Sequence, residues 1–252
     1  MKLVAPVLSA VLLLAACGSS DGGESGAASS SSGDDVPGLS LEQIGDDDMA
    51  VLGSYDIDGS EIEDGVDGPP SAEAQAVFDR YVAVIPEEMR DGVVSFLFID
   101  IEQSDGIDGA LQAVIGNDGE PNGQRYIALG RDDPSSLTRT MVHESGHALF
   151  TDAAGEINAL AEEFNAAFPP GDEYDPELFV TEYAASSPED GGEDIAESFS
   201  MYVLGETDFA GDDDGDGAPD RIDPDTVAGE KVAFFESYDV LVEYRQAILA
   251  SL

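Results

Sequence analysis

Both histidines of this 252-residue chain lie in one short segment, TMVHESGHALF, residues 140–150. His143 and His147 are four residues apart, so on a helix their imidazoles leave the same face and can point at one metal ion. Neutral imidazole nitrogen suits zinc, and a catalytic zinc site has three protein ligands and one open position. Glu144 lies about 100° further round such a helix, where its carboxylate can take a proton from water beside the metal. The segment therefore predicts a zinc site and supplies two of its three ligands.

The third ligand has to be a carboxylate, because no other histidine exists in the chain. The extended metzincin pattern places a third histidine six residues after the second, and Ala153 occupies that position, which excludes that class. Since the chain contains 55 Asp and Glu residues, an acidic residue by itself is weak evidence. The third ligand therefore has to be identified from the residues that surround it in the sequence.

The best surroundings are those of GGEDIAESFSMYVLG, residues 191–205. Glu193 and Glu197 are four apart and share one face of a helix whose other positions are mostly apolar. Such a helix is expected to be buried, and buried carboxylates need partners. Zinc can be the partner of one carboxylate, and the N–H of a zinc-bound imidazole can be the partner of the other. The competing candidates for the third ligand are Asp194, Asp152 and Glu156.

HESGH followed by EDIAESF resembles the gluzincin pattern, in which HExxH is completed by a glutamate on a second helix. YAASSPEDGGEDIAESFSMYV is similar to a stretch found in a group of bacterial zinc metallopeptidases, and more distantly to the ligand helix of the anthrax lethal factor peptidase domain. The resemblance is best over residues 137–204. It implies that Glu193 is the third zinc ligand, that Glu197 orients His143, and that Tyr183 stabilises an oxyanion.

The same resemblance implies a zincin-like α+β fold in which a strand such as RYIALG, residues 125–130, borders the cleft and pairs with an extended peptide. The expected activity is hydrolysis of peptide bonds in a peptide or protein substrate, with Glu144 as general base. The alternative is a non-catalytic, metal-binding surface lipoprotein. Glu144 distinguishes the two, since metal binding alone does not need it.

A second metal pattern lies in GDDDGDGAPDRID, residues 211–223. Its spacing is that of calcium loops, with Gly217 at the position of the sharp turn, and it resembles a thrombospondin type 3 repeat. The expected calcium ligands are Asp212, Asp214, Asp216, the Ala218 carbonyl, Asp220 and Asp223. Calcium here would fasten the connection to the last helix. The alternative is an acidic loop that matches the pattern because acidic residues are abundant.

The N-terminus resembles that of a bacterial lipoprotein. A short basic start and an apolar run, Leu3 to Leu14, are followed by LAAC, which is similar to a lipobox. Residues 1–17 are thus expected to be a signal peptide, with lipid on Cys17 anchoring the protein to the membrane outside the cytoplasm. An ordinary signal peptide with an incidental cysteine is the alternative. Residues 18–70 are expected to form an acidic, Gly/Ser-rich tether and leader.

The metallopeptidase domain is expected to span residues 71–252, with 42% apolar residues in the chain to build its core. A net charge of -46 repels phosphate backbones and excludes nucleic acid as a partner. Apolar periodicity and the Asp133-Pro134 helix start predict a small mixed or antiparallel sheet followed by the HExxH helix and further helices. The expected helices cover 71–85, 135–150, 157–168, 192–204 and 228–249, and the expected strands cover 93–101, 111–115 and 125–130.

Overall fold

The computed structural model describes residues 49–65, 68–104, 108–115, 121–152, 156–171, 174–186, 191–205, 207 and 222–252. Within these ranges the chain has a mixed α+β fold with one sheet and six α-helices. The predicted signal peptide, Cys17 and most of the predicted tether lie outside the described residues.

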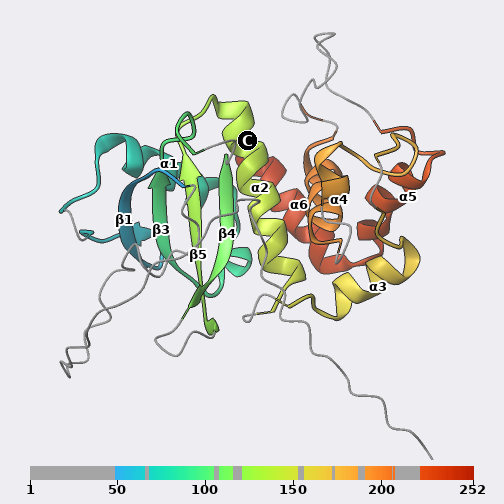
Figure 1. Cartoon of the computed structure of the whole chain (residues 1–252), viewed down its shortest axis with the longest axis horizontal. Coiled ribbons are helices and arrows are strands. Elements are labelled where there is room, and N and C mark those ends of the chain that lie inside the picture. Colours follow the sequence, from blue (N-terminus) through green and yellow to red (C-terminus); the bar gives the residue numbers. More distant parts are fainter. Residues whose placement is uncertain are drawn as a thin grey trace, which may run out of the picture. The chain divides into compact units, whose positions relative to one another are not determined.

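The sheet has five strands in the order β2-β1-β3-β5-β4 (Figure 1). β3 and β5 are parallel, and the other neighbouring pairs are antiparallel. The strands are β1 (Val51–Asp58), β2 (Glu61–Ile62), β3 (Val93–Ile99), β4 (Gly109–Ile115) and β5 (Pro121–Gly130).

β1 shows that the folded domain begins before Ser71, the predicted start. This strand pairs with β3 along most of its length, and Tyr55 on it is buried while Leu52, near its start, is exposed. The alternation of Val51, Gly53, Tyr55 and Ile57 with other residues carries the period of a strand. Gly, Ser and Asp occupy four of its eight positions and give it the composition of a leader.

The two central strands are buried on both faces. On one face Phe96, Phe98 and Ile127 join a large core with residues of the helices, and on the other Leu97 and Tyr126 join a smaller cluster. Such strands are nearly continuous apolar runs, as VVSFLFI is, because neither face meets water.

β4 is one of the two edge strands of the described sheet, and the two-residue β2 is the other. β5, which contains RYIALG, pairs with β3 on one side and β4 on the other. The expectation that RYIALG pairs with a peptide is therefore wrong, because its backbone N–H and C=O groups are already used within the sheet. Any strand added beside the helix that carries HExxH would have to pair with β4.

The helices follow the predicted start and stop signals closely in the first part of the chain. α1 begins after Ser71, whose hydroxyl accepts a hydrogen bond from the Ala74 amide at 3.0 Å. The helices are α1 (Ala72–Val84), α2 (Pro134–Phe150), α3 (Ala159–Ala167), α4 (Gly192–Leu204), α5 (Val227–Phe234) and α6 (Asp239–Ser251). Short 3-10 helices cover Glu87–Arg90, Tyr183–Ser186 and Phe235–Ser237.

The prediction of a single helix over residues 228–249 is wrong, since the structure has two helices there, α5 and α6. Phe235 begins the break and is fully buried, with its ring centroid 5.6 Å from those of Phe199 and Tyr202 on α4. Tyr238 then takes an extended conformation before α6 starts. Residues 235–238, where the break occurs, contain no Gly or Pro to signal it, so the packing of Phe235 against α4 accounts for it.

α2 lies between the β4 edge of the sheet and α4 (Figure 1). Its C-terminal end is fastened to the sheet by Arg125 of β5, a buried side chain that donates hydrogen bonds to the backbone oxygens of Thr151 at 2.8 Å and Asp152 at 2.6 Å. The last carbonyl groups of a helix find no donor within the helix itself, and the Arg125 guanidinium supplies donors at this end. The helix that carries both histidines is thereby held at a fixed distance from β5.

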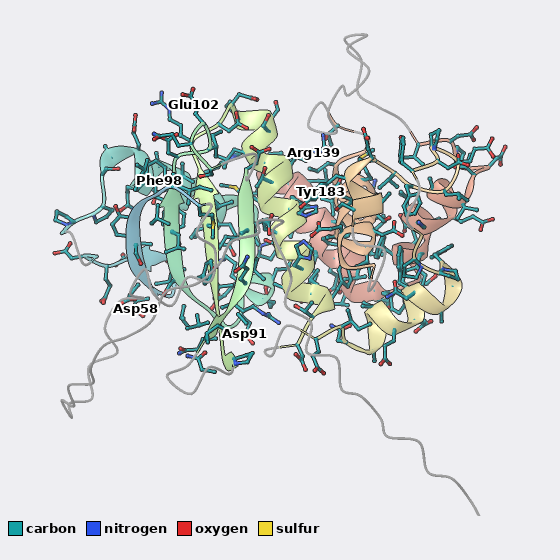
Figure 2. The ribbon with its side chains drawn as sticks, viewed as in Figure 1. Asp58, Asp91, Phe98, Glu102, Arg139 and Tyr183 are labelled. Carbon is teal, nitrogen blue, oxygen red and sulfur yellow. The ribbon has the colours of Figure 1, made fainter. Side chains whose placement is uncertain are left out.

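The surface carries many acidic side chains, among them the exposed Asp58, Asp91 and Glu102 (Figure 2). They are spread over β1, the turn before β3 and the turn after it. This distribution fits a solvated acidic surface rather than a single binding patch.

Candidate metal centre

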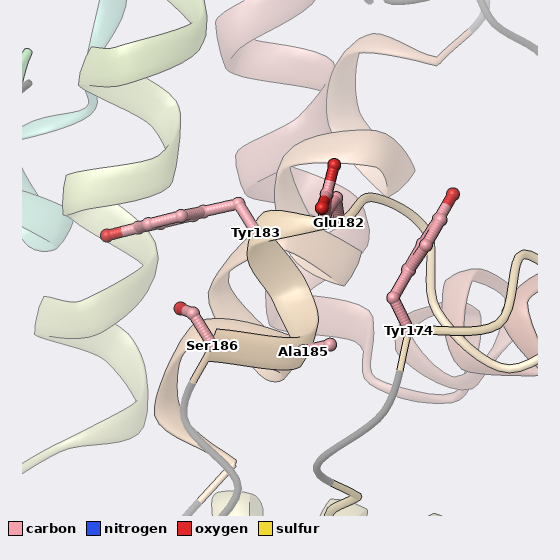
Figure 3. A pocket seen from close by; sticks show the side chains of 5 residues that line it. All are labelled: Tyr174, Glu182, Tyr183, Ala185 and Ser186. Atoms are coloured by element: carbon pink, nitrogen blue, oxygen red, sulfur yellow. The ribbon is translucent and has the colours of Figure 1, made fainter.

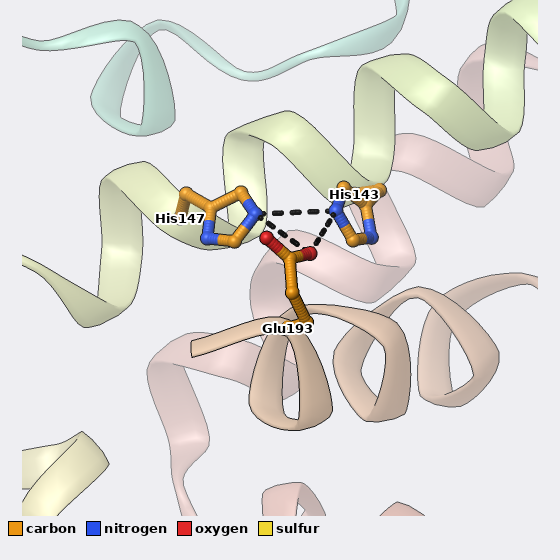
Figure 4. A group of neighbouring side chains, drawn as sticks. All are labelled: His143, His147 and Glu193. Atoms are coloured by element: carbon orange, nitrogen blue, oxygen red, sulfur yellow. Dashed lines mark hydrogen bonds and ion pairs between the residues drawn. The ribbon is translucent and has the colours of Figure 1, made fainter. Parts of the chain in front are cut away.

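α2 directs the two histidines at one point (Figure 4). The helix starts at Pro134, and the Asp133 side chain accepts hydrogen bonds from the Ser135 and Ser136 amides at 2.9 and 3.3 Å. Nine residues on, His143 and His147 occupy successive turns, with ring centroids 4.8 Å apart and Nε2 atoms 3.1 Å apart. Helical spacing alone thus brings the two nitrogens together.

α4 supplies Glu193 to the same point (Figure 4). Its Oε2 lies 3.1 Å from His143 Nε2 and 3.4 Å from His147 Nε2. As expected from its apolar sequence, α4 is buried along nearly its whole length. It packs closely on α2, where a Cβ on Gly146 would lie 3.4 Å from Ala196 Cα, in ordinary van der Waals contact.

The three donor atoms fit a metal ion. Since zinc–nitrogen and zinc–oxygen bonds are about 2.0–2.2 Å long, two ligand atoms of one tetrahedral zinc are about 3.3–3.5 Å apart, close to the separations here. Glu193 Oε2 is buried and accepts no hydrogen bond of regular geometry from a described residue. Among the described residues, His143, His147 and Glu193 form the one group of this kind that could hold a metal ion.

Glu197, one turn further along α4, lies behind His143. Its Oε1 is 2.6 Å from His143 Nδ1, and its Oε2 accepts a hydrogen bond from the Thr181 hydroxyl at 2.7 Å. Arg139 Nη2 is 3.5 Å from the same Oε2. Although burial favours the neutral acid, contact with His143 and the charge of Arg139 lower the pKa of Glu197. Glu197 is thus held as an anion against the imidazole nitrogen that faces away from the triad.

The charges of the triad reinforce one another. Burial lowers the pKa of His143, but its contacts with Glu193 and Glu197 and the charge of Glu144 outweigh burial and raise that pKa well above its usual value. Burial likewise raises the pKa of Glu193, and the two imidazoles outweigh it, so the net shift is downward. The site is a buried anionic cluster that favours a cation.

Asp194, the nearest competing ligand, is engaged elsewhere. Its Oδ2 lies 2.6 Å from Lys231 Nζ of α5, and both side chains are almost fully buried. Lys231 also lies over the Phe179 ring, 4.2 Å from its centroid. Burial raises the pKa of Asp194, and the lysine partly offsets that effect. The other two candidates, Asp152 and Glu156, lie beyond the end of α2, where Asp152 Oδ1 accepts from the Glu156 amide at 3.1 Å.

Glu144 is buried on the side of α2 that faces β4. Burial raises the pKa of its carboxyl group, while the two imidazoles and the Leu111 backbone of β4 act in the opposite direction. β4 approaches α2 so closely that a Cβ on Gly109 would collide with Thr140 Cγ2 and lie 3.4 Å from Glu144 Cγ. Glu144 is therefore enclosed between the edge strand and the metal triad.

Tyr183 begins the short 3-10 helix Tyr183–Ser186, which we call the Tyr183 turn. Its ring centroid is 5.7 Å from that of His143, and 55% of the residue is exposed. Burial of the ring and the charges of three glutamates raise the pKa of its phenol above the usual range, so the hydroxyl stays protonated. The three glutamates are Glu193, Glu144 and Glu197.

A shallow hollow of about 590 Å³ lies beside Tyr183 (Figure 3). Tyr183 extends from the turn toward α2, whereas Glu182 and Tyr174 point elsewhere along the hollow (Figure 3). The residues that line it are Tyr174, Glu182, Tyr183, Ala185 and Ser186. The hollow combines the phenol rings of Tyr174 and Tyr183 with the carboxylate of Glu182.

Three residues that contact the buried carboxylates of α4 are not identifiable as such from the sequence, namely Thr181, Arg139 and Lys231. Arg139 carries one signal, since it precedes His143 by four residues and so shares its helix face. Thr181 and Lys231 carry none, because their contacts with α4 join segments distant in sequence.

Most of the predicted calcium loop lies outside the described residues, and Asp223 is the only one of its six expected ligands within them. Asp223 Oδ1 accepts a hydrogen bond from the Asp225 amide at 3.0 Å, and its backbone oxygen accepts one from the Thr226 hydroxyl at 2.7 Å. These contacts form the turn that leads into α5. Calcium binding stays a prediction.

Comparison with known proteins identifies no relative: no family model, no curated protein and no solved structure matches the chain. Within the described part of the chain, no helix has both the length and the apolar character needed to cross a bilayer. The functional argument therefore depends on the geometry of the triad and its neighbours.

Proposed function

We propose that this protein is a zinc-dependent peptidase of the gluzincin type with a zincin-like fold. The observation that carries the proposal is the meeting of His143 Nε2, His147 Nε2 and Glu193 Oε2 within 3.4 Å beside a buried glutamate, Glu144. A site built only to bind metal does not need that glutamate, because a structural zinc site is closed by four protein ligands. The resemblance to gluzincins supports the same assignment.

In this proposal His143, His147 and Glu193 hold the zinc ion. When bound, zinc supplies Lewis acidity, which lowers the pKa of a water molecule and polarises the scissile carbonyl. Glu197 keeps His143 in one orientation and one protonation form, as a carboxylate on the outer nitrogen of a ligating imidazole does. The donors are thereby fixed before substrate arrives.

Glu144 accepts a proton from the attacking water and returns it to the leaving nitrogen. A carboxyl group whose pKa is raised by burial suits this double role, since it must both take and release a proton near neutral pH. Tyr183, protonated and close to His143, donates a hydrogen bond to the oxyanion of the tetrahedral intermediate. An extended peptide pairs with the edge of β4 that no other described strand covers. Such a peptide would pass close to Glu144.

The test is peptide hydrolysis combined with metal analysis on the same samples. Glu144→Gln is expected to retain one zinc per chain and to lose activity by about 10²–10⁴-fold, whereas Glu193→Ala is expected to lose both. Glu162→Gln, an exposed glutamate of α3, is the matched control and should change neither. A wild-type protein that binds zinc but cuts no peptide of a general library would leave the non-catalytic metal-binding protein as the better answer.

The proposal also places the peptidase outside the cytoplasm, anchored by lipid on Cys17. Two acyl chains suffice to hold a protein on a membrane. Anchoring by lipid therefore does not require a transmembrane helix. Metabolic labelling with a fatty acid is expected to mark the wild-type protein. The Cys17→Ser variant should carry no label, and a labelled variant would refute attachment at this residue.

A further inference from the structure

Thr181 connects the metal centre with the Tyr183 turn through one buried hydroxyl group. Its Oγ1 donates to Glu197 Oε2 at 2.7 Å and accepts from the Ala184 backbone amide at 3.1 Å. A hydroxyl has one proton to donate and lone pairs to accept with, so both contacts exist at the same time. Thr181 and Ala184 are buried, at 7% and 1% exposed, so water does not replace these bonds.

The contacts form a continuous path. His143 Nδ1 lies 2.6 Å from Glu197 Oε1, and the other oxygen of the same carboxylate holds the Thr181 hydroxyl. The Ala184 amide follows directly after Tyr183, whose side chain extends from the turn toward α2 (Figure 3). The orientation of the imidazole and the position of the turn therefore depend on one carboxylate.

We propose that Thr181 is a positioning residue that couples metal binding to the placement of Tyr183. A metal ion on His143 Nε2 fixes the ring and hence the direction of Nδ1, which fixes the Glu197 carboxylate. The carboxylate then fixes the Thr181 hydroxyl and the amide bonded to it. The metal part of this inference needs only the triad, whereas the role of Tyr183 in turnover rests on the proposed function.

Thr181→Val tests the coupling, because valine has nearly the same shape but can neither donate to Glu197 nor accept from the Ala184 amide. Thr181→Ser retains the hydroxyl and serves as the rescue. Thr138→Val is the matched control, since Thr138 is also buried and its hydroxyl donates to the Pro134 carbonyl at 2.7 Å, away from the triad's donor atoms.

Two measurements do not need turnover. Zinc affinity, measured by competition with a chelator, is expected to fall about 10-fold in Thr181→Val and to recover in Thr181→Ser. Hydrogen exchange of the Ala184 amide is expected to slow when zinc binds to the wild type and to Thr181→Ser, but not when it binds to Thr181→Val. Unchanged affinity together with zinc-dependent protection in Thr181→Val would overturn the proposal, as would equal affinity losses in Thr138→Val.

Turnover at saturating zinc completes the test. We expect Thr181→Val to lower kcat with little change in KM, and the Thr181→Val/Tyr183→Phe double variant to lose little more than Tyr183→Phe alone, because both act through one group. Fully multiplicative losses would mean that Thr181 does not act through Tyr183. If the wild type cuts no peptide, the proposed function fails. Zinc affinity and amide exchange still decide whether Thr181 couples metal binding to the position of the Tyr183 turn.

Discussion

Two clusters of buried charge lie side by side on α4, and they are completed differently. Asp194 has a protein cation of its own, Lys231 Nζ at 2.6 Å. Glu193 has two imidazoles, which carry a full positive charge only when protonated, and its Oε2 accepts no regular hydrogen bond from a described residue. The first cluster is complete within the chain, and the second has donor atoms arranged for an ion from outside.

The comparison suggests why neighbouring carboxylates on one helix have separate roles. A buried carboxylate is unfavourable unless it is paired. A lysine that is fixed from α5 neutralises Asp194 permanently and so removes it from competition for metal. Glu193, one residue earlier, faces α2 instead and stays available. Structural stability and metal binding should therefore respond to different substitutions.

The largest expected effect on stability is that of Lys231→Met, which leaves Asp194 buried and unpaired. Breaking a buried ion pair in this way lowers the free energy of unfolding by about 3–5 kcal/mol, to be measured by urea denaturation. Zinc affinity of the folded variant should stay within about threefold of wild type, since additive effects are expected for separate clusters. Asp194→Leu/Lys231→Met should recover most of the loss, and a parallel loss of zinc affinity would contradict the separation.

Removal of metal should act on the other cluster alone. Zinc at 100 times its Kd stabilises the folded state by about 2.7 kcal/mol, so a zinc-selective chelator, used with calcium in excess, is expected to lower the Tm of the wild type by several degrees. Lys231→Met should show the same chelator-induced decrease from its lower starting point. Glu193→Ala should show none, and a decrease in that variant would mean that the metal binds elsewhere.

α2 packs against β4 as well as α4, and one glycine lies at each of these two contacts, Gly109 and Gly146. Gly109→Ala should destabilise the protein by about 1–3 kcal/mol through overpacking and lower kcat, because its Cβ would collide with Thr140, which lies one helical turn before Glu144. Gly146→Ala fits against Ala196 and should stabilise by up to about 1 kcal/mol through helix propensity. Thermal denaturation and kcat of both variants test this, and equal effects would remove the distinction between the two faces.

The protonation of His143 makes zinc binding depend on pH. Burial lowers the pKa of His143, but Glu193, Glu197 and Glu144 together raise it well above the usual value for histidine. In the metal-free protein the ring therefore stays protonated at pH values where a free imidazole is neutral. Zinc has to displace that proton, so affinity falls as pH falls, by up to tenfold per pH unit for one proton. Calorimetry in buffers of different ionisation enthalpy should detect release of about one proton at neutral pH.

The smallest effect is expected from an exposed carboxylate, Glu182, in the hollow beside Tyr183. Exposed ion pairs contribute little, so Glu182→Gln should reduce the preference for a peptide with lysine over one with norleucine by about 2–5-fold in kcat/KM. The preference of the wild type should weaken with added salt. A change above tenfold would indicate that Glu182 is buried against the bound peptide.

Local sequence predicted those parts of the fold that depend on local rules. The Asp133-Pro134 start, the spacing of His143 and His147, and the bounds of α4 all follow from helix capping and helix periodicity. The apolar surroundings of Glu193 and Glu197 also indicated their burial, because few other positions on that helix are polar.

Long-range packing determined the parts that could not be predicted. The break at Phe235 arises from contacts with α4, and the order of β4 and β5 depends on strand pairing rather than on either strand's composition. β1 was assigned to the leader because Gly, Ser and Asp occupy half of its positions. Thr181 acquires its role only when its segment folds against α4, so its own neighbours in sequence do not indicate it.

The free edge of β4 has a consequence for the solubility of the protein. Gly109–Ile115 contains no charged residue, and an edge that no other described strand covers is where a second copy of a chain can add a strand. A net charge of -46 opposes such pairing, because two copies repel each other before their edges meet. Salt screens this repulsion, so we expect association of two copies through this edge to become more favourable as the salt concentration rises.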